Sequence, residues 1–203
     1  GTGPPGPVLI DFPKDMATEM IDVDWEDVQI RLRGYRPTVK GNTKMIRRAL
    51  EEILRAQRPV LYVGGGIIRS NAAQELTYLA RALGIPVTAT LMGKGAFPET
   101  DDLYLGVPGM HGTAFANYAL DNADLIICIG ARFDDRVTGD VSRFAPSARV
   151  VHVDVDPAEV GKVVNADVPV VGDAKHVLVE LLAELAESGE RARDLSAWHA
   201  QIQ

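Results

Sequence analysis

Short, mostly apolar runs alternate along this chain with longer segments in which apolar residues recur at helical spacing. Strands buried on both faces are apolar at nearly every position, and parallel strands need crossover connections, which are usually helices. The alternation therefore predicts a doubly wound, Rossmann-like α/β domain in three layers, with a parallel sheet of about six strands between helices. Five of the strands are expected at residues 60–63, 87–90, 125–129, 150–153 and 168–171.

Helices are predicted where the apolar period is helical and where end signals flank the segment. The first begins near Thr43 and stops before Pro59. A second is expected after a capping box that starts at Asn71, and Gly84 is expected to end it. A third follows residue 111, and the last spans residues 174–185.

Both ends of the chain depart from this pattern. Residues 8–12 are an apolar run between two prolines and are expected to be a strand that ends a preceding domain. The charged residues after position 186 are expected to connect to a domain downstream. We divide the chain into 1–16, the end of a preceding domain; 17–42, a linker; 43–186, the α/β domain; and 187–203, a connector.

Charge and composition exclude several classes of partner. The formal net charge is −7, and the basic residues are scattered, so binding to nucleic acid or to an anionic membrane surface is not expected. No apolar stretch is long enough to span a membrane, and the first residues do not resemble a signal peptide, so the cytoplasm is the expected location. The single cysteine, Cys128, lies in an apolar run and is expected to be a buried structural thiol.

Ligands of doubly wound sheets bind beyond the carboxyl ends of the strands. The run Gly64-Gly65-Gly66 follows the first strand, and its glycines allow the main chain to approach a pyrophosphate. The nicotinamide dinucleotide fingerprint is incomplete, because Arg69 stands where a third spaced glycine is expected and no acidic residue follows the second strand. Taken alone, the run can also be only a tight turn.

Two more loops combine glycine with apolar side chains of medium size. Residues 90–92 end the second strand, and residues 109–111 precede a helix. Met92 and Met110 can line a flat ring, although methionine also fills gaps in ordinary cores. His111 has no carboxylate or nucleophile at a recognisable spacing, so we do not expect it to be an acid–base catalyst.

The remaining strand ends are polar. Residues 130–139, GARFDDRVTG, place two arginines and two aspartates after an apolar strand. Such charges are costly near an interior unless they pair with one another or with a ligand phosphate, and the alternative is a solvated surface cluster. Asp154 can accept hydrogen bonds from ribose hydroxyls, and Asp173 can do the same or cap the last helix. No spacing gathers three hard ligands in one loop, so no metal site is expected.

Six runs resemble, in order and spacing, the central domain of acetohydroxyacid synthase (acetolactate synthase) large subunits. They are PVLYVGGG, IPVTATLMGKGAFP, GMHGTAFANYA, GARFDDRVTG, VVHVDVDPAEVGK and PVVGDA, and the resemblance covers nearly the whole chain. RFDDRVTG is the most specific of these strings, because related thiamine diphosphate enzymes share the fold but generally lack it. Catabolic acetolactate synthases, which do without FAD, also lack it.

The resemblance implies that FAD lies extended across the strand ends without a redox role in the main reaction. It implies that Asp135 and Arg136 also lie near the substrate channel and that no catalytic residue belongs to this chain. By matching motif, the cofactor-binding residues are Gly64, Gly65 and Gly66 near the diphosphate; Thr90, Leu91, Met92, Gly109, Met110 and His111 on the flavin and ribityl side; Gly130, Arg132, Asp134, Arg136 and Val137 around the ribityl and phosphate; and Asp154, Val155, Gly172, Asp173 and Ala174 around the adenosine.

The resemblance also implies an activity for the whole enzyme, which condenses two pyruvates, or pyruvate with 2-oxobutyrate, with loss of carbon dioxide in branched-chain amino acid biosynthesis. The resemblance places thiamine diphosphate and magnesium in the other domains, so the chain alone is expected to be inactive. Residues 1–16 are expected to be the end of the first of these domains. The full enzyme is expected to be a homo-oligomer with a regulatory subunit. One position departs from the family, because Pro4 stands where an arginine usually contacts FAD.

Two alternatives remain open at this point. One is a domain of glyoxylate carboligase or of a related thiamine diphosphate decarboxylase, against which RFDDRVTG argues. The other is a non-catalytic nucleotide- or flavin-binding module, as in the subunits of electron-transfer flavoproteins.

Overall fold

The computed structural model describes residues 6–26, 38–190 and 193–202. The chain forms two units, residues 1–37 and 38–203. In the described part of the first unit, α1 spans Lys14–Thr18. The predicted strand at residues 8–12 is wrong: these residues have no regular structure and are exposed, because a strand needs a hydrogen-bonded neighbour and an apolar run alone does not supply one. Pro4 lies outside the described residues.

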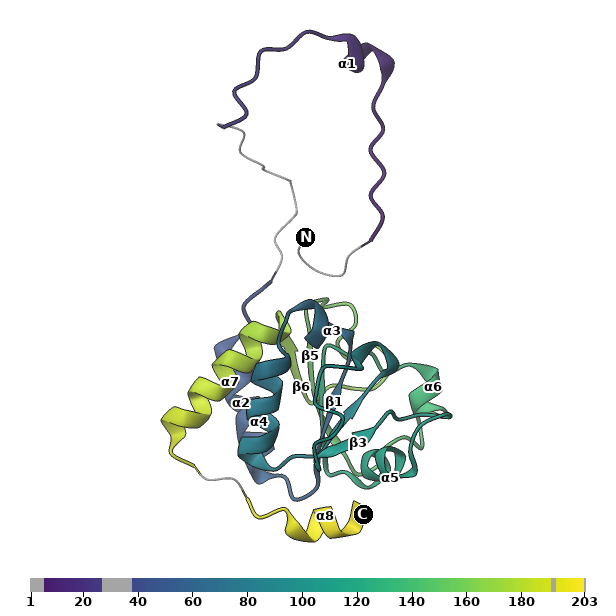
Figure 1. Ribbon diagram of the computed structural model, residues 1–203, viewed down its shortest axis with the longest axis vertical. Coiled ribbons are helices and arrows are strands. Elements are labelled where there is room, and N and C mark those ends of the chain that lie inside the picture. Colours follow the sequence, from purple (N-terminus) through teal and green to yellow (C-terminus); the bar gives the residue numbers. More distant parts are fainter. Residues whose placement is uncertain (1–5, 27–37, 191–192, 203) are drawn as a thin grey trace. The chain divides into compact units, whose positions relative to one another are not determined.

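The second unit contains a sheet of six parallel strands in the order β3-β2-β1-β4-β5-β6 (Figure 1). This confirms the predicted doubly wound sheet. All five residues of each central strand, β1 and β4, are buried, which explains why both read as continuous apolar runs. The strands are β1 Pro59–Val63, β2 Val87–Ala89, β3 Tyr104–Gly106, β4 Leu125–Ile129, β5 Arg149–Asp154 and β6 Val168–Val171.

Helices cover the sheet as the apolar periods predicted. Figure 1 shows α2 (Thr43–Arg55), α4 (Ala73–Leu83) and α7 (Ala174–Ser188) together on one side of the sheet and α5 (Ala114–Asn122) on the other. Gly84 ends α4 in the left-handed conformation, as expected for a glycine at this position. Within the described residues, no helix is both long enough and apolar enough to cross a membrane.

Three local features differ from the sequence reading or add to it. The capping box is wrong, because α4 begins at Ala73 without a side-chain cap and Asn71 instead adopts a positive φ of 53° in the preceding turn. The sequence pattern does not predict the short strand β3 (Tyr104–Gly106). Near the end of the chain, α8 (Ser196–Ile202) packs on the domain: Trp198 is 2% exposed and donates a hydrogen bond to the carbonyl of Pro59 over 3.1 Å.

Candidate functional site

The structure brings the predicted site residues to one edge of the sheet. Apart from Asp154, which is the last residue of β5, they lie in loops or at the starts of helices that follow the carboxyl ends of strands. The strand order reverses between β1 and β4, and a reversal of this kind is where ligands of doubly wound sheets bind. The loops after β1 and β4 therefore form the centre of the candidate site.

Glycines allow these two loops to touch. The N–H of Gly66 donates to the carbonyl of Gly130 over 2.9 Å. A Cβ atom on Gly64 would lie 2.5 Å from the same carbonyl oxygen, and a Cβ atom on Gly66 would lie 2.5 Å from the Cα of Gly130. The glycine run is thus required by packing between loops, in addition to any role toward a ligand. Gly65, which starts α3 (Gly65–Arg69), faces η1 (Leu91–Gly93) instead, with Met92 as the neighbour of its would-be Cβ.

The apolar side chains of the next loops do not belong to the core. Leu91 is 73% exposed, and Met92 and Met110 are each 77% exposed. The interpretation of these methionines as ordinary packing residues is therefore wrong. Large apolar side chains held in water at a strand-end edge indicate a surface that gains from being covered.

The loop at Met110 is tied to the polar cluster. The N–H of Met110 donates to the carbonyl of Arg136 over 3.1 Å, and Gly109 has a φ of +104° that favours glycine. Asn117 of α5 holds Gly109 through two hydrogen bonds, accepting from its N–H over 2.7 Å and donating to its carbonyl over 3.0 Å. Sequence reasoning missed Asn117, since nothing in its spacing distinguishes it from an ordinary polar helix residue.

The charged cluster is exposed and organised around a short helix, α6 (Asp135–Thr138). Asp134 caps it by accepting from the N–H of Arg136, and this hydrogen bond is the main reason that the pKa of Asp134 is lowered. The Arg136 guanidinium lies 3.0 Å from Asp135 and 3.5 Å from Asp134. Within residues 6–26, 38–190 and 193–202, the exposed side chain of Arg132 forms no salt bridge.

The aspartates after β5 and β6 differ in their surroundings. Asp154 is partly buried, and burial raises the pKa of its carboxyl group. Asp173 accepts hydrogen bonds from the N–H groups of Lys175 and His176, so it caps α7, one of the two roles left open by the sequence. The hydrogen bonds that this carboxylate makes to the described residues all use Oδ1.

The remaining groups with possible chemistry are His111, the metal-ligating side chains and Cys128. His111 is exposed and makes no side-chain hydrogen bond to the described residues. Among those residues, no group of three metal-ligating side chains comes together. Cys128 is buried, and burial raises the pKa of its thiol well above the ordinary value, which agrees with a structural role.

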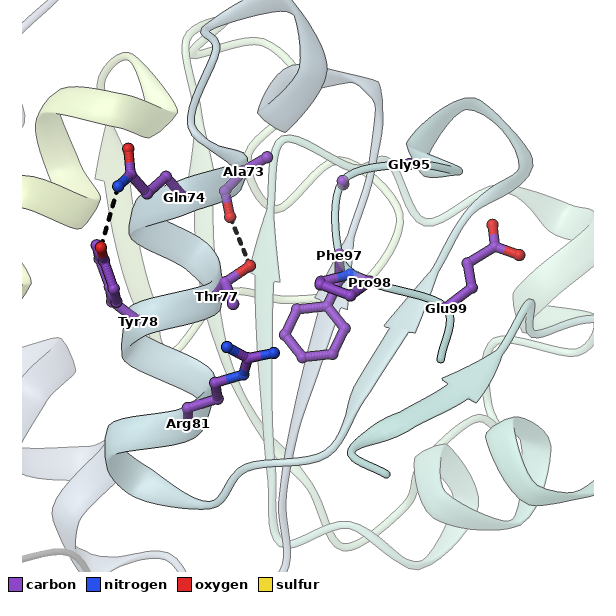
Figure 2. A pocket seen from close by; sticks show the side chains of 10 residues that line it. Ala73, Gln74, Thr77, Tyr78, Arg81, Gly95, Phe97, Pro98 and Glu99 are labelled. Atoms are coloured by element: carbon purple, nitrogen blue, oxygen red, sulfur yellow. Dashed lines mark hydrogen bonds between the residues drawn. The ribbon is translucent and has the colours of Figure 1, made fainter. Parts of the chain in front are cut away.

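A hollow of about 650 Å³ lies away from the predicted residues, between α4 and residues 95–99 (Figure 2). Tyr78 accepts a hydrogen bond from Gln74 at its rim over 3.0 Å, and Thr77 donates to the carbonyl of Ala73 over 2.7 Å. None of the predicted site residues lines it.

Comparison with known proteins identifies the family. A family described as "Thiamine pyrophosphate enzyme, central domain" matches residues 46–181. The acetolactate synthase large subunit of Corynebacterium glutamicum is 50% identical over 197 residues, which are 97% of this chain and 31% of that protein. The probable acetolactate synthase large subunit of Methanocaldococcus jannaschii is 52% identical over 203 residues, 99% of this chain and 34% of that protein.

A more distant relative is the acetolactate synthase large subunit of Haemophilus influenzae, which is 44% identical over 203 residues, 99% of this chain and 35% of that protein. The chain spans about a third of the length of these curated relatives. The chain belongs to the thiamine pyrophosphate enzyme family, and residues 46–181 match the central domain of that family.

Proposed function

We propose that this chain is the central domain of an acetolactate synthase large subunit and that it binds FAD along the carboxyl edge of its sheet. The exposure of Leu91, Met92 and Met110 beside glycine loops and a polar cluster is the observation that carries the proposal. Apolar walls with a few convergent polar groups are what a flat ring with a phosphate tail requires. The identity of about half the sequence to proteins named acetolactate synthase supports the same assignment.

The polar groups at this edge fit the remaining parts of FAD. The exposed guanidinium of Arg132 can pair with a phosphate, since Arg–phosphate contacts are charge-assisted and often bidentate. Asp154 is a partly buried acceptor suited to ribose hydroxyls, and Oδ2 of Asp173 is left for the same use after Oδ1 has capped α7. We assign the other cofactor-binding residues as the resemblance implies, and Asp135 and Arg136 also to the substrate channel.

We further propose the activity of the whole enzyme, which condenses two pyruvates, or pyruvate with 2-oxobutyrate, with loss of carbon dioxide. Thiamine diphosphate and magnesium supply that chemistry from other domains, while this chain's residues hold FAD. The proposal includes a homo-oligomer and a regulatory subunit, and the relatives named "large subunit" support a smaller partner. The chain alone should therefore make no acetolactate from pyruvate, even when FAD, magnesium and thiamine diphosphate are added. Turnover above a buffer control contradicts this.

The alternatives make different predictions. A glyoxylate carboligase domain is disfavoured because the relatives described above are named acetolactate synthases. A non-catalytic flavin module would pass electrons, so reduction of the bound flavin by a physiological electron donor would favour it. If the donor does not reduce the bound flavin, the non-redox role is favoured.

Calorimetric titration with FAD and with ADP tests the proposal. The described residues offer the isoalloxazine ring mainly Leu91, Met92 and Met110, and a ring covered on one face gains only part of the free energy of burial. We therefore expect FAD to bind with an affinity within about tenfold of that of ADP, a difference of about 1.4 kcal/mol. FAD binding a hundredfold tighter would show that this chain encloses the flavin by itself. No binding of either ligand would overturn the proposal.

A further inference from the structure

Three buried side chains form a row across the central strands, directly beneath the loop that carries the charged cluster. In the strand register, Tyr62 of β1 lies beside Cys128 of β4, and Cys128 lies beside His152 of β5. Tyr62 and Cys128 are fully buried, and His152 is 1% exposed. Two of the three carry strongly polar groups in the middle of an otherwise apolar sheet, where a polar group without a partner is costly.

All three polar groups of this row reach the same stretch of main chain. The Tyr62 hydroxyl donates to the carbonyl of Arg132 over 2.9 Å. The Nε2 atom of His152 lies 3.2 Å from the carbonyl oxygen of Ala131, and the Cys128 thiol lies 3.2 Å from that oxygen too. Within the described residues, no backbone N–H reaches either carbonyl. The side chains of the row therefore supply the hydrogen bonds to these two carbonyl groups that the main chain does not.

The tautomer of His152 follows from its second contact. Its Nδ1 atom lies 3.4 Å from the N–H of Gly161, which can only donate, so Nδ1 accepts. The hydrogen of the neutral ring is then on Nε2, where it is donated to Ala131. Phe133 closes the arrangement, since its ring packs 5.5 Å from the Tyr62 ring and 5.4 Å from the His152 ring between centroids.

The consequence is an alternation of side chains along the loop. Ala131 and Phe133 are buried, whereas Arg132 between them is exposed. Because the carbonyl groups of Ala131 and Arg132 are hydrogen-bonded to side chains of the sheet, the Arg132 side chain faces outward. Asp134 follows at once as the cap of α6.

We propose that Tyr62 and His152 are positioning residues, which hold the main chain of residues 131–133 so that Arg132 and Asp134 face the ligand. This rests on the proposed function, because the ligand in question is FAD. Neither residue touches the ligand; both act through the loop.

The first test removes one hydroxyl group from the row. Tyr62→Phe deletes only the hydroxyl, and we expect the FAD affinity to fall about fivefold to tenfold while AMP, which needs mainly the adenosine side, changes by less than twofold. Hydrogen exchange without ligand should become severalfold faster in residues 131–137. Tyr104→Phe is the matched control, because that hydroxyl, on a partly buried tyrosine of β3, makes no hydrogen bond to the described residues. It should leave FAD affinity and exchange unchanged.

The second test uses a pair of substitutions at His152. In His152→Gln, the amide can still donate at the position of Nε2, whereas His152→Leu removes the donor. Retained FAD affinity in the glutamine variant with a loss in the leucine variant supports positioning. Equal losses of FAD and AMP in Tyr62→Phe, or loop exchange that does not change, would overturn it. If the wild-type chain does not bind FAD, the proposed function fails, and the exchange measurement still decides whether the row holds the loop.

Discussion

The N–H of Gly66 and the carbonyl of Gly130 are joined by a 2.9 Å hydrogen bond at the point where the strand order reverses. A Cβ atom on Gly66 would lie 2.5 Å from the Cα of Gly130, which is main chain and cannot rotate away. The loops after β1 and β4 are therefore packed backbone to backbone.

This contact predicts a large cost for Gly66→Ala, because the two loops must separate to admit the methyl group. We expect a loss of about 1–3 kcal/mol in the free energy of unfolding, measured in urea. Gly65→Ala is the control, since its Cβ would lie 3.3 Å from Met92 and Gly65 has no positive φ, and it should cost less than about 1 kcal/mol. A Gly66→Ala chain as stable as the control would contradict the packing role.

Substitution of an exposed methionine should weaken FAD binding without changing the stability of the fold. Met92→Ser changes a side chain that is 77% exposed, so the free energy of unfolding should stay within about 0.5 kcal/mol of wild type. FAD affinity should fall toward that of ADP, with ADP affinity unchanged, because only the flavin loses an apolar contact. Val179→Ser, which changes an exposed residue inside α7 that is not among the predicted site residues, should affect neither ligand. Unchanged FAD affinity in Met92→Ser would count against the proposed flavin surface.

The partly buried carboxylate of Asp154 should lower the stability of the fold while it strengthens ligand binding. Burial raises its pKa in the folded chain, so the ionised form costs stability above that folded pKa, and the cost is relieved as the pH falls through it. Asp154→Asn should unfold at higher urea concentration at pH 7. It should bind AMP more weakly by about 1 kcal/mol, since a charged acceptor makes the stronger hydrogen bond.

Asp140→Asn is the control of opposite sign. Hydrogen bonds from Ser142 lower the pKa of Asp140, so its ionised form stabilises the fold at pH 7, and the substitution should unfold at lower urea concentration. If both variants shift the urea midpoint in the same direction, the argument from Asp154 burial is wrong.

His152 predicts a loss of stability on mild acidification. Burial lowers the pKa of its imidazole in the folded chain below the unfolded value of about 6.5. Its contribution is fully present above about pH 6.5 and is lost as the pH falls from there toward the folded pKa. Urea midpoints between pH 7.5 and 5.5 should decline less steeply in His152→Gln than in wild type. Identical slopes in His152→Gln and in wild type would refute the prediction.

Local sequence determined most of the fold. The residues at 125–129, and those at 150–153 except His152, are apolar because both faces of these strands are covered, and a helix such as α7 is recognised by its one apolar face. Gly84 ends α4 because a left-handed residue closes a helix without a steric penalty. These signals depend on each segment's own burial, so they can be read without knowing its neighbours. They also predicted that the candidate site residues lie at one edge, since all parallel strands end on the same side.

Only the tertiary structure decided the features that depend on a partner distant in sequence. Residues 8–12 read as a strand but pair with no strand among the described residues, whereas the three residues of β3 become a strand because β2 lies beside them. In the sequence, Tyr62 is one more aromatic residue in an apolar run. The fold places its hydroxyl 2.9 Å from a carbonyl oxygen 70 residues away. A hydrogen bond of that kind has no local period or composition, because its two ends meet only after β1 and β4 have paired.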